Sequence, residues 1–331
     1  MVQARGITGY RSLMRELGLD PIPFLKRFEI DPTAIDHEDE LIPLDAVCAL
    51  LEASSQAAAC PNFGLRMSLK QSIDILGPLG LIMQNAATPF EAIELAGQYL
   101  FTHSPALKLD VCQQSLLVDD AIECAIEMDL PNVPHQRQTI DLCLGTSLQI
   151  SRVIKPDGTR LKAVTLPHSP VAPLSVYQKF FGAAVLANEP VAALHFAAEG
   201  WNAPMTGSNQ TLKQVTQDYL SRNFPSPHSP MKDRVRMVLR PLLGTPRAGR
   251  DDVAQILAIH PRSLHRHLAQ EATSFFEIKD GLRRELAQKY LSESEMPLTQ
   301  LAALLGFPEQ SALSRACRKW FNASPSQLRK R

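Results

Sequence analysis

Residues 297–319 of the chain read PLTQLAALLGFPEQSALSRACRK. A short apolar segment ends at Gly306, and a second amphipathic segment, Pro308 to Lys319, follows after a tight turn. Glycine adopts the positive φ that a sharp helix exit requires, and the small side chain of Ala302 lets two helices cross closely. The stretch therefore predicts a helix-turn-helix motif. Its expected core consists of Leu301, Leu305, Phe307 and Leu313.

Residues 251–268, DDVAQILAIHPRSLHRHL, repeat this pattern. Ala254 takes the place of Ala302, and Ala258 takes the place of Gly306. Two acidic residues open the first helix, where the helix dipole favours negative charge, and a proline suits the first turn of the second helix. The turn is one residue shorter than in the other copy. The chain is therefore expected to contain two helix-turn-helix motifs.

A predicted helix joins the two copies. Residues 274–291 carry apolar side chains at positions 275, 278, 282, 286 and 290, which is the spacing of one helix face. At about 1.5 Å per residue, this helix would be roughly 25 Å long. With the helices it connects, it would hold two reading helices about one DNA turn, roughly 34 Å, apart. We therefore expect one chain to enter two successive major grooves.

Residues 232–331 resemble the AraC/XylS transcription regulators. The resemblance rests on RSLHRHL at 262–268, LRRELA at 282–287, LLGF at 304–307, LSRA at 313–316 and SPSQLR at 324–329. It implies an all-α domain that binds double-stranded DNA through two helix-turn-helix motifs. It also implies RNA polymerase as a partner, and an activator rather than a repressor.

The resemblance assigns roles to individual residues. Arg318 and Lys319 are expected to contact phosphate. Arg315 lies off the apolar face marked by Leu313, so its guanidinium can offer two parallel hydrogen bonds to guanine. The expected base-edge contacts are Arg262, His265 and Arg266 in the first reading helix, and Gln310, Ser311, Ser314 and Arg315 in the second.

Three positions depart from the family pattern. Cys317 stands where phenylalanine is usual, Asn322 where glycine is common, and Leu328 where tyrosine is common. Asparagine tolerates the left-handed conformation and leucine keeps its site apolar, so neither threatens the fold. Cys317 removes core volume, which is expected to loosen the second motif by about 1 kcal/mol or more if no neighbour fills the gap.

Charge is distributed unevenly along a chain whose net charge is zero. Residues 1–227 hold 16 Lys and Arg against 24 Asp and Glu, whereas residues 228–331 hold 18 against 10, so the net charges are −8 and +8. A basic part joined to an acidic one suits a DNA-binding domain whose neighbouring domain does not adhere to phosphate.

The first 223 residues are expected to form an α+β domain for effector sensing or dimerisation. Thr88, Pro89 and Glu91 form a capping box that predicts a helix running to about residue 103. Further helices are expected at 7–28, with a stop at 18–21, from Pro43, and at 135–150, 173–181 and 208–223. Strands are expected at 107–111, 116–128, 160–166 and 191–196, and a loop at 31–41. Residues 224–230, with three prolines, predict a linker before the DNA-binding domain at 231–331.

Residues 15–200 also resemble the arabinose-binding-like sensor domain found at the N-terminus of such regulators. The resemblance rests on FGLR at 63–66, GPLG at 77–80, ATPFEA at 87–92 and the aromatic residues Tyr177, Phe180 and Phe181. It implies small-molecule sensing but names no ligand, because these domains respond to chemically diverse effectors. The effector-binding residues are therefore unknown at this stage.

Other classes of protein receive no support from the sequence. No nucleotide-binding, zinc-protease or hydrolase motif occurs, so no enzyme activity or cofactor is expected. No metal is expected at His265 and His267, because residues two apart on a helix face different directions. The six cysteines form no C-x-x-C pair, and neither a signal-peptide core nor a bilayer-length apolar run is present. A cytoplasmic, nucleoid-associated protein with reduced thiols and no membrane contact is expected.

These observations predict a transcription activator controlled by a small-molecule effector, and the chain is expected to form homodimers. Two alternatives remain at this stage. The first is a constitutive DNA-binding protein whose N-terminal domain only dimerises, and the second is an enzyme with a DNA-binding tail.

Overall fold

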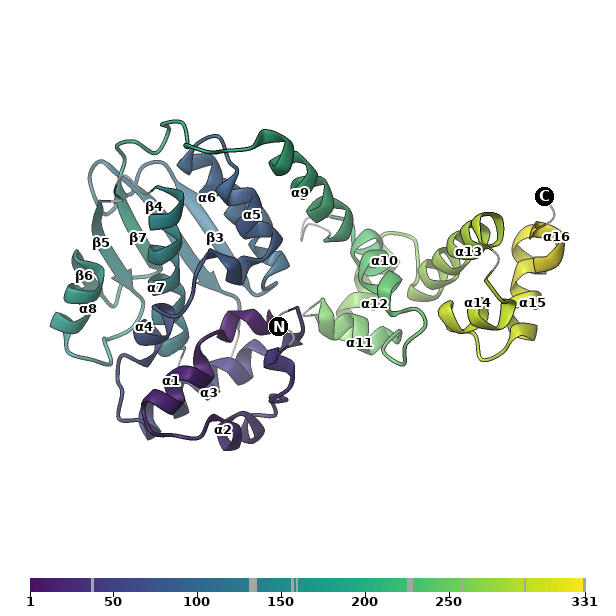
Figure 1. The fold of residues 1–331 in the computed structure, drawn as a ribbon, viewed down its shortest axis with the longest axis horizontal. Coiled ribbons are helices and arrows are strands. Elements are labelled where there is room, and N and C mark those ends of the chain that lie inside the picture. Colours follow the sequence, from purple (N-terminus) through teal and green to yellow (C-terminus); the bar gives the residue numbers. More distant parts are fainter. Residues whose placement is uncertain are drawn as a thin grey trace. The chain divides into compact units, whose positions relative to one another are not determined.

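The computed structural model describes residues 1–36, 39–130, 136–155, 158, 160–224, 229–257, 259–294 and 296–329. The chain divides into two compact units, Met1–Arg222 and Asn223–Arg331 (Figure 1). The division lies at the end of helix α9 (Gln210–Asn223). Most of the expected linker at 224–230 falls outside the described residues.

A five-stranded sheet forms the centre of the N-terminal unit. Its strand order is β3 (Leu107–Cys112), β4 (Ala121–Met128), β7 (Ala192–Ala197), β5 (Leu161–Leu166) and β6 (Ala184–Ala187). Neighbouring strands are antiparallel except β5 and β6, which are parallel. The β4–β7 register, Cys124 opposite Leu194 and Ile126 opposite Ala192, sends Cys124 and Ile126 to the same face.

Helix α7 (Arg137–Ile154) lies across that face of the sheet, in front of β4 and β7 in Figure 1. Helix α4 (Phe63–Ser68) packs closely on α7, because a Cβ at Gly64 would clash with the Gln138 carbonyl oxygen. The Gly64 N–H donates to Gln138 Oε1 at 2.8 Å. The remaining helices of this layer are η3 (Ile73–Leu76), α5 (Pro78–Gln84), α6 (Pro89–Tyr99), η4 (Leu100–Thr102) and α8 (Leu174–Phe181).

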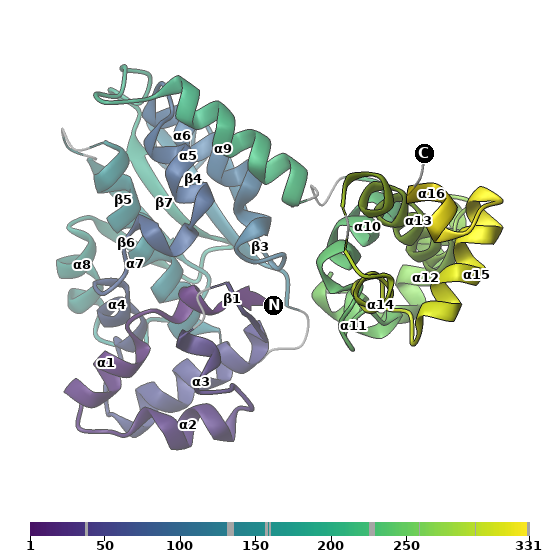
Figure 2. The same cartoon turned by 45° about the vertical axis from the view of Figure 1, so that its right-hand side comes forward.

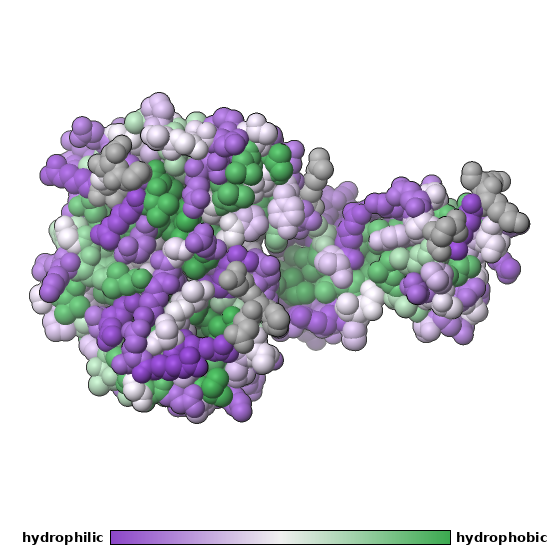
Figure 3. Space-filling view, in the orientation of Figure 1, coloured by the Kyte–Doolittle hydropathy of each residue, from purple (hydrophilic) through white to green (hydrophobic). Residues whose placement is uncertain are grey.

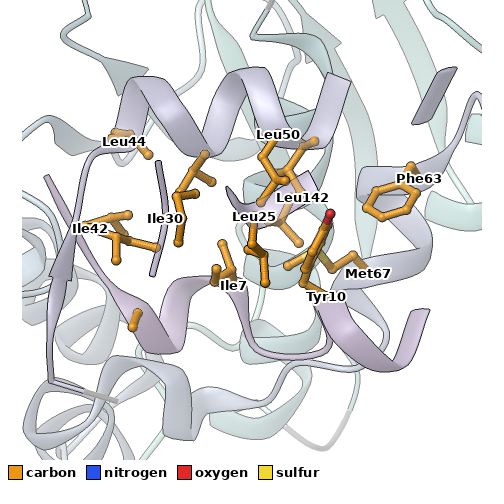
Figure 4. Packing of buried hydrophobic residues seen from close by; sticks show 14 of the residues in the cluster. Ile7, Tyr10, Leu25, Ile30, Ile42, Leu44, Leu50, Phe63, Met67 and Leu142 are labelled. Atoms are coloured by element: carbon orange, nitrogen blue, oxygen red, sulfur yellow. The ribbon is translucent and has the colours of Figure 1, made fainter. Parts of the chain in front are cut away.

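The first 57 residues form a helical layer beside the sheet. It contains β1 (Val2–Gln3), η1 (Ala4–Ile7), α1 (Tyr10–Glu16), α2 (Pro21–Arg27), η2 (Ala34–Asp36), β2 (Leu41–Ile42) and α3 (Leu44–Ala57). Figure 4 shows Tyr10, Leu25, Leu50 and Phe63 converging in its core, where Leu142 joins them from α7. The layer and the sheet are therefore parts of one unit.

Several details of the expected N-terminal elements were wrong. The first helix begins at Tyr10 rather than at residue 7, whereas the expected stop at 18–21 is confirmed: Gly18 takes a positive φ of 78° and Asp20 caps a new helix. The expected strand at Leu116 and Val118 is instead a turn, in which the Ser115 hydroxyl accepts from two backbone N–H groups. The helix from Pro89 ends at Tyr99 and continues only as a 3₁₀ turn. The expected loop at 31–41 contains η2 and the start of β2, and the short edge strand β6 was not predicted.

The C-terminal unit is helical throughout its described secondary structure. Its elements are α10 (Met231–Leu242), α11 (Arg250–Ile256), α12 (Pro261–Gln270), α13 (Phe275–Glu293), α14 (Leu298–Leu304), α15 (Gln310–Phe321) and α16 (Pro325–Arg329) (Figure 2). A single hydrophobic core includes Leu264 of α12, Leu282 of α13 and Leu313 of α15. The expected fold class, an α+β unit followed by an all-α unit with two helix-turn-helix motifs, is thus confirmed.

Candidate DNA-binding surface and effector cavity

The first helix-turn-helix motif consists of α11 and α12. The Arg262 N–H donates to His260 Nδ1 at 3.1 Å, which caps the start of α12. Leu264 is fully buried, and the side chains of Arg262, His265 and Arg266 are exposed. The three predicted base-contact residues of this motif are therefore accessible. Ala258, the expected turn position, lies outside the described residues.

The second motif consists of α14 and α15, joined by a turn at Gly306. Gly306 has a φ of 68°, and its N–H donates to the Ala303 carbonyl at 2.9 Å. The Phe307 N–H donates to the Ala302 carbonyl at 2.8 Å, so the two bonds form a Schellman motif. A Cβ at Gly306 would clash with the Leu243 carbonyl oxygen, so glycine is required by both conformation and space.

Helix α15 carries the remaining predicted DNA contacts. Leu313 and Cys317 are fully buried, and Ser314 is half-buried. The exposed predicted contacts are Gln310, Ser311, Arg315, Arg318 and Lys319. Hydrophilic side chains accordingly dominate the visible surface around α15 in Figure 3. The structure therefore leaves these candidates free of the unit's own core.

Glu309 organises the start of α15, which sequence reasoning missed. Its carboxylate accepts a hydrogen bond from the Ser311 hydroxyl and lies 3.7 Å from the Arg315 guanidinium. Arg315 Nη1 also donates to Ser311 Oγ at 3.2 Å. Two predicted base-contact residues, Ser311 and Arg315, thus share one acidic partner.

Helix α13 holds the second motif through Arg283. Arg283 Nε donates to the Leu305 carbonyl at 2.8 Å, and Nη2 donates to the Gly306 carbonyl at 2.6 Å. The guanidinium carbon lies 4.5 Å from the centroid of the Phe307 ring. These carbonyls belong to the end of α14, where helix geometry leaves acceptors without partners. Arg283 therefore connects the linker helix directly to the turn that orients α15.

The first backbone N–H groups of α10 find their hydrogen-bond acceptor in a residue that follows the first motif. Glu271, just after α12, accepts hydrogen bonds from the Met231 and Lys232 N–H groups. A carboxylate at a helix N-terminus also interacts favourably with the helix dipole. Arg236 of α10 forms an ion pair with Glu285 of α13. Helix α10 is thereby tied to both the first motif and the linker helix.

The three departures from the family pattern have simple structural outcomes. Cys317 is fully buried, and burial raises the pKa of its thiol to about 11. Asn322 takes a left-handed conformation with a φ of 53° at the end of α15. Leu328 packs against the shared core. Cys317 and Leu328 therefore contribute to the core, and Asn322 ends α15.

A cavity of ≈ 130 Å³ lies in the N-terminal unit between α7 and the sheet. The α7 residues that line it run from Thr139 to Ile154 at helical spacing, and Ile126 and Phe196 contribute from the sheet. Other lining residues come from segments far apart in the sequence, including Val2 and Trp201. No sequence motif marks this cavity, because it exists only once these segments are folded together.

Few polar groups line the cavity, and among the described residues two of them, the His103 ring Nδ1 and the Thr139 hydroxyl, lack a hydrogen-bond partner. The His103 side chain is buried, and burial, reinforced by nearby Arg5, lowers the imidazole pKa to about 4. His103 is therefore neutral at physiological pH. By contrast, Gln71 is engaged, since its amide donates to the Gly6 carbonyl at 2.9 Å and accepts from Thr146 at 2.7 Å.

The fold and the surface define a class of protein. Two helix-turn-helix motifs, joined by a linker helix, present exposed cationic residues on α12 and α15. This arrangement is that of a sequence-specific DNA-binding transcription regulator. In the part of the chain that is described, no helix has the length and apolar character to cross a membrane, and no group of three His, Cys, Asp or Glu side chains could hold a metal ion.

Comparisons with known proteins identify the family. The arabinose-binding domain of AraC transcription regulators matches residues 18–205, and a helix-turn-helix domain matches residues 253–331. The chain belongs to the AraC family of transcription regulators, and its relatives are regulators rather than enzymes.

Two curated regulators are similar over nearly the full chain. The HTH-type transcriptional regulator VirS of Mycobacterium tuberculosis is 33% identical over 329 residues, which cover 99% of this chain and 96% of VirS. The ornithine utilization regulator of Pseudomonas aeruginosa is 24% identical, covering 96% of this chain and 93% of that protein. The solved transcriptional regulator CdpR from Pseudomonas aeruginosa aligns with a TM-score of 0.45 and 20% identity, covering 94% and 96% of the two chains.

Proposed function

We propose that this regulator activates transcription under the control of a small effector bound in the cavity of its N-terminal unit. The observation that carries the proposal is a mostly apolar cavity in a unit matched by a ligand-binding domain family, on a chain with an exposed DNA-binding surface. For control, the effector must bind two arrangements of the protein with different affinities. Because its proposed binding sites are promoters on the chromosome, the protein is proposed to act in the cytoplasm, at the nucleoid.

Within this proposal, the exposed residues of α12 and α15 have distinct roles. The guanidinium groups of Arg266 and Arg315 suit the two acceptors of guanine in the major groove. The same surface supports base-edge roles for Arg262, His265, Gln310, Ser311 and Ser314. Arg318 and Lys319, in the last turn of α15, suit phosphate contacts that position the protein without reading sequence.

Two arginines of α15 form a matched pair for testing these roles. A preferred DNA site is first selected from a random library with the full chain. Arg315→Ala is expected to reduce discrimination between that site and random DNA by roughly 1–3 kcal/mol. Arg318→Ala is expected to weaken binding to both DNAs equally and to reduce the salt dependence. Fluorescence anisotropy across a salt series measures both effects, and equal losses on both DNAs from Arg315→Ala would remove it from the base-reading set.

The N-terminal unit also offers a surface for the homodimer included in this proposal. Leu212, Val215 and Tyr219 are exposed along one side of α9. A hydrogen bond from Lys213 Nζ of α9 to Glu91 Oε1 of α6, at 2.7 Å, connects the two helices. Sedimentation velocity on the full chain and a Val215→Glu variant tests the dimer, which the variant is expected to weaken. A purely constitutive dimerising role would leave DNA binding unaffected by every cavity ligand.

Activation requires contact with RNA polymerase, which the proposal includes as a partner. In vitro transcription with purified polymerase and the selected site placed upstream of a promoter is the direct assay. The full chain is expected to increase transcript yield, with a further change when the cavity is occupied. A decrease in transcript would instead identify a repressor.

A further inference from the structure

The shape of the N-terminal cavity restricts its ligand. The α7 stripe that lines it runs from Thr139 to Ile154, a distance of about 22 Å along the helix. The volume over this length is only ≈ 130 Å³. A dry apolar cavity of about 150 Å³ accommodates a benzene molecule. A similar volume drawn out along a helix therefore suits a slender chain rather than a bulky ring system.

The lining also restricts the ligand's charge. No Lys, Arg, Asp or Glu occurs among the described residues that form the wall, and His103 is neutral. An ionised group buried without a partner is strongly unfavourable. A ligand that fills this cavity is therefore uncharged.

The wall provides little for a highly hydroxylated ligand. Gln71 and Thr146 bond to each other, and the Ser151 hydroxyl donates to the Leu148 carbonyl at 2.8 Å. His103, only 5% exposed, keeps a ring nitrogen without a partner among the described groups, and the buried Thr139 hydroxyl likewise lacks one, so the wall offers two such groups. A sugar would bury several hydroxyls without partners, and each such group costs about 1–3 kcal/mol. The cavity therefore does not suit arabinose, despite the name of the matching domain family.

We infer that the cavity binds an uncharged, slender, mainly apolar molecule that places one hydrogen-bonding group against His103. This inference rests on the proposed function, because it assigns a chemical class to the proposed effector.

A homologous series of probes tests the ligand class on the full chain. The primary alcohols from 1-butanol to 1-decanol are uncharged chains with one hydroxyl. Affinity, measured by calorimetry, is expected to rise about fourfold per added methylene until the cavity is full, and then to fall. Octanoate, with the same chain but a charge, and L-arabinose are each expected to bind at least about tenfold more weakly than 1-octanol.

Two variants locate the binding. Ala96→Phe adds a ring to the wall from α6 and is expected to abolish alcohol binding, whereas Gln98→Phe adds the same ring on the exposed side and is the matched control. His103→Leu removes the polar contact and is expected to weaken 1-octanol binding about five- to tenfold while the chain-length trend persists. Circular dichroism and binding to the selected DNA confirm that each variant is folded.

The outcomes separate the ligand class from the proposed control. Absence of binding by every alcohol, or tighter binding of octanoate or arabinose, overturns the inference. Unchanged affinity in Ala96→Phe overturns the assigned site. If the alcohols bind as expected but alter neither DNA affinity nor transcription, the ligand class stands and control by the cavity fails.

Discussion

Replacing Arg283 with methionine tests whether the linker helix positions the second helix-turn-helix motif. The substitution keeps an unbranched apolar chain but removes the hydrogen bonds to the Leu305 and Gly306 carbonyls. It also removes the cation from its place 4.5 Å from the Phe307 ring centroid. If α13 holds the turn through this side chain, both stability and sequence discrimination must fall.

The size of the loss follows from the contacts. Hydrogen bonds from a charged donor contribute about 1.5–3 kcal/mol each, and a cation–π contact about 0.5–1 kcal/mol. Arg283 is only half-buried, so water can partly replace it, and burial of the guanidinium, which lowers its pKa, opposes the gain. We therefore expect the free energy of unfolding of the C-terminal unit to fall by about 2–3 kcal/mol.

Urea unfolding followed by tryptophan fluorescence measures this loss. Trp320 reports on the second motif, because its indole N–H donates to Asp280 of α13 at 3.0 Å. A Trp201→Phe background removes the signal from the N-terminal unit. Arg284→Met is the control, since that exposed neighbour only lies over the Phe321 ring at 5.5 Å. Equal losses from the two variants, or a loss below about 0.5 kcal/mol for Arg283→Met, would refute the reasoning.

Three further outcomes are expected. Gly306→Ala should destabilise the C-terminal unit by more than about 1 kcal/mol in urea unfolding, because alanine disfavours the positive φ and its Cβ meets the Leu243 carbonyl; an unchanged midpoint would contradict this. At pH 8, iodoacetamide should label exposed Cys112 well before Cys317, whose buried thiol has a pKa raised to about 11; mass spectrometry gives the order. The His103 pKa of about 4 lies below its ordinary 6.5, so the unfolded chain binds the proton more readily. Stability should fall by up to about 3 kcal/mol as pH drops from 6.5 to 4, and His103→Leu should lose this component.

Sequence patterns predicted the C-terminal unit well because its helices and turns are determined by residues close together in the sequence. Gly306 and Ala302 identify a turn and a helix crossing from their own conformational and steric properties. The stripe from Phe275 onward likewise predicts a helix that the structure places at Phe275–Glu293. By contrast, Arg283 and Glu271 bond across 22 to 40 positions, and no local rule indicates such partners.

The N-terminal unit was predicted less completely for the same reason. The longer strands β4 and β7 have apolar patterns that mark them, whereas the four-residue edge strand β6 has burial on one residue only. The cavity depends on contacts between residues as distant as Val2 and Trp201. The residues that line the cavity therefore could not be predicted before the fold of the N-terminal unit was known.

The acidic partner of Arg315 has a consequence for selectivity. The Glu309 carboxylate lies 3.7 Å from the Arg315 guanidinium and neutralises part of its charge. A duplex must displace this internal counter-ion, and its phosphates repel the freed carboxylate. Only a base pair that gives the guanidinium two directed hydrogen bonds compensates for both effects. If Arg315 reads a base as proposed, Glu309 competes with DNA for its guanidinium, which lowers the attraction to every sequence and disfavours the wrong ones most.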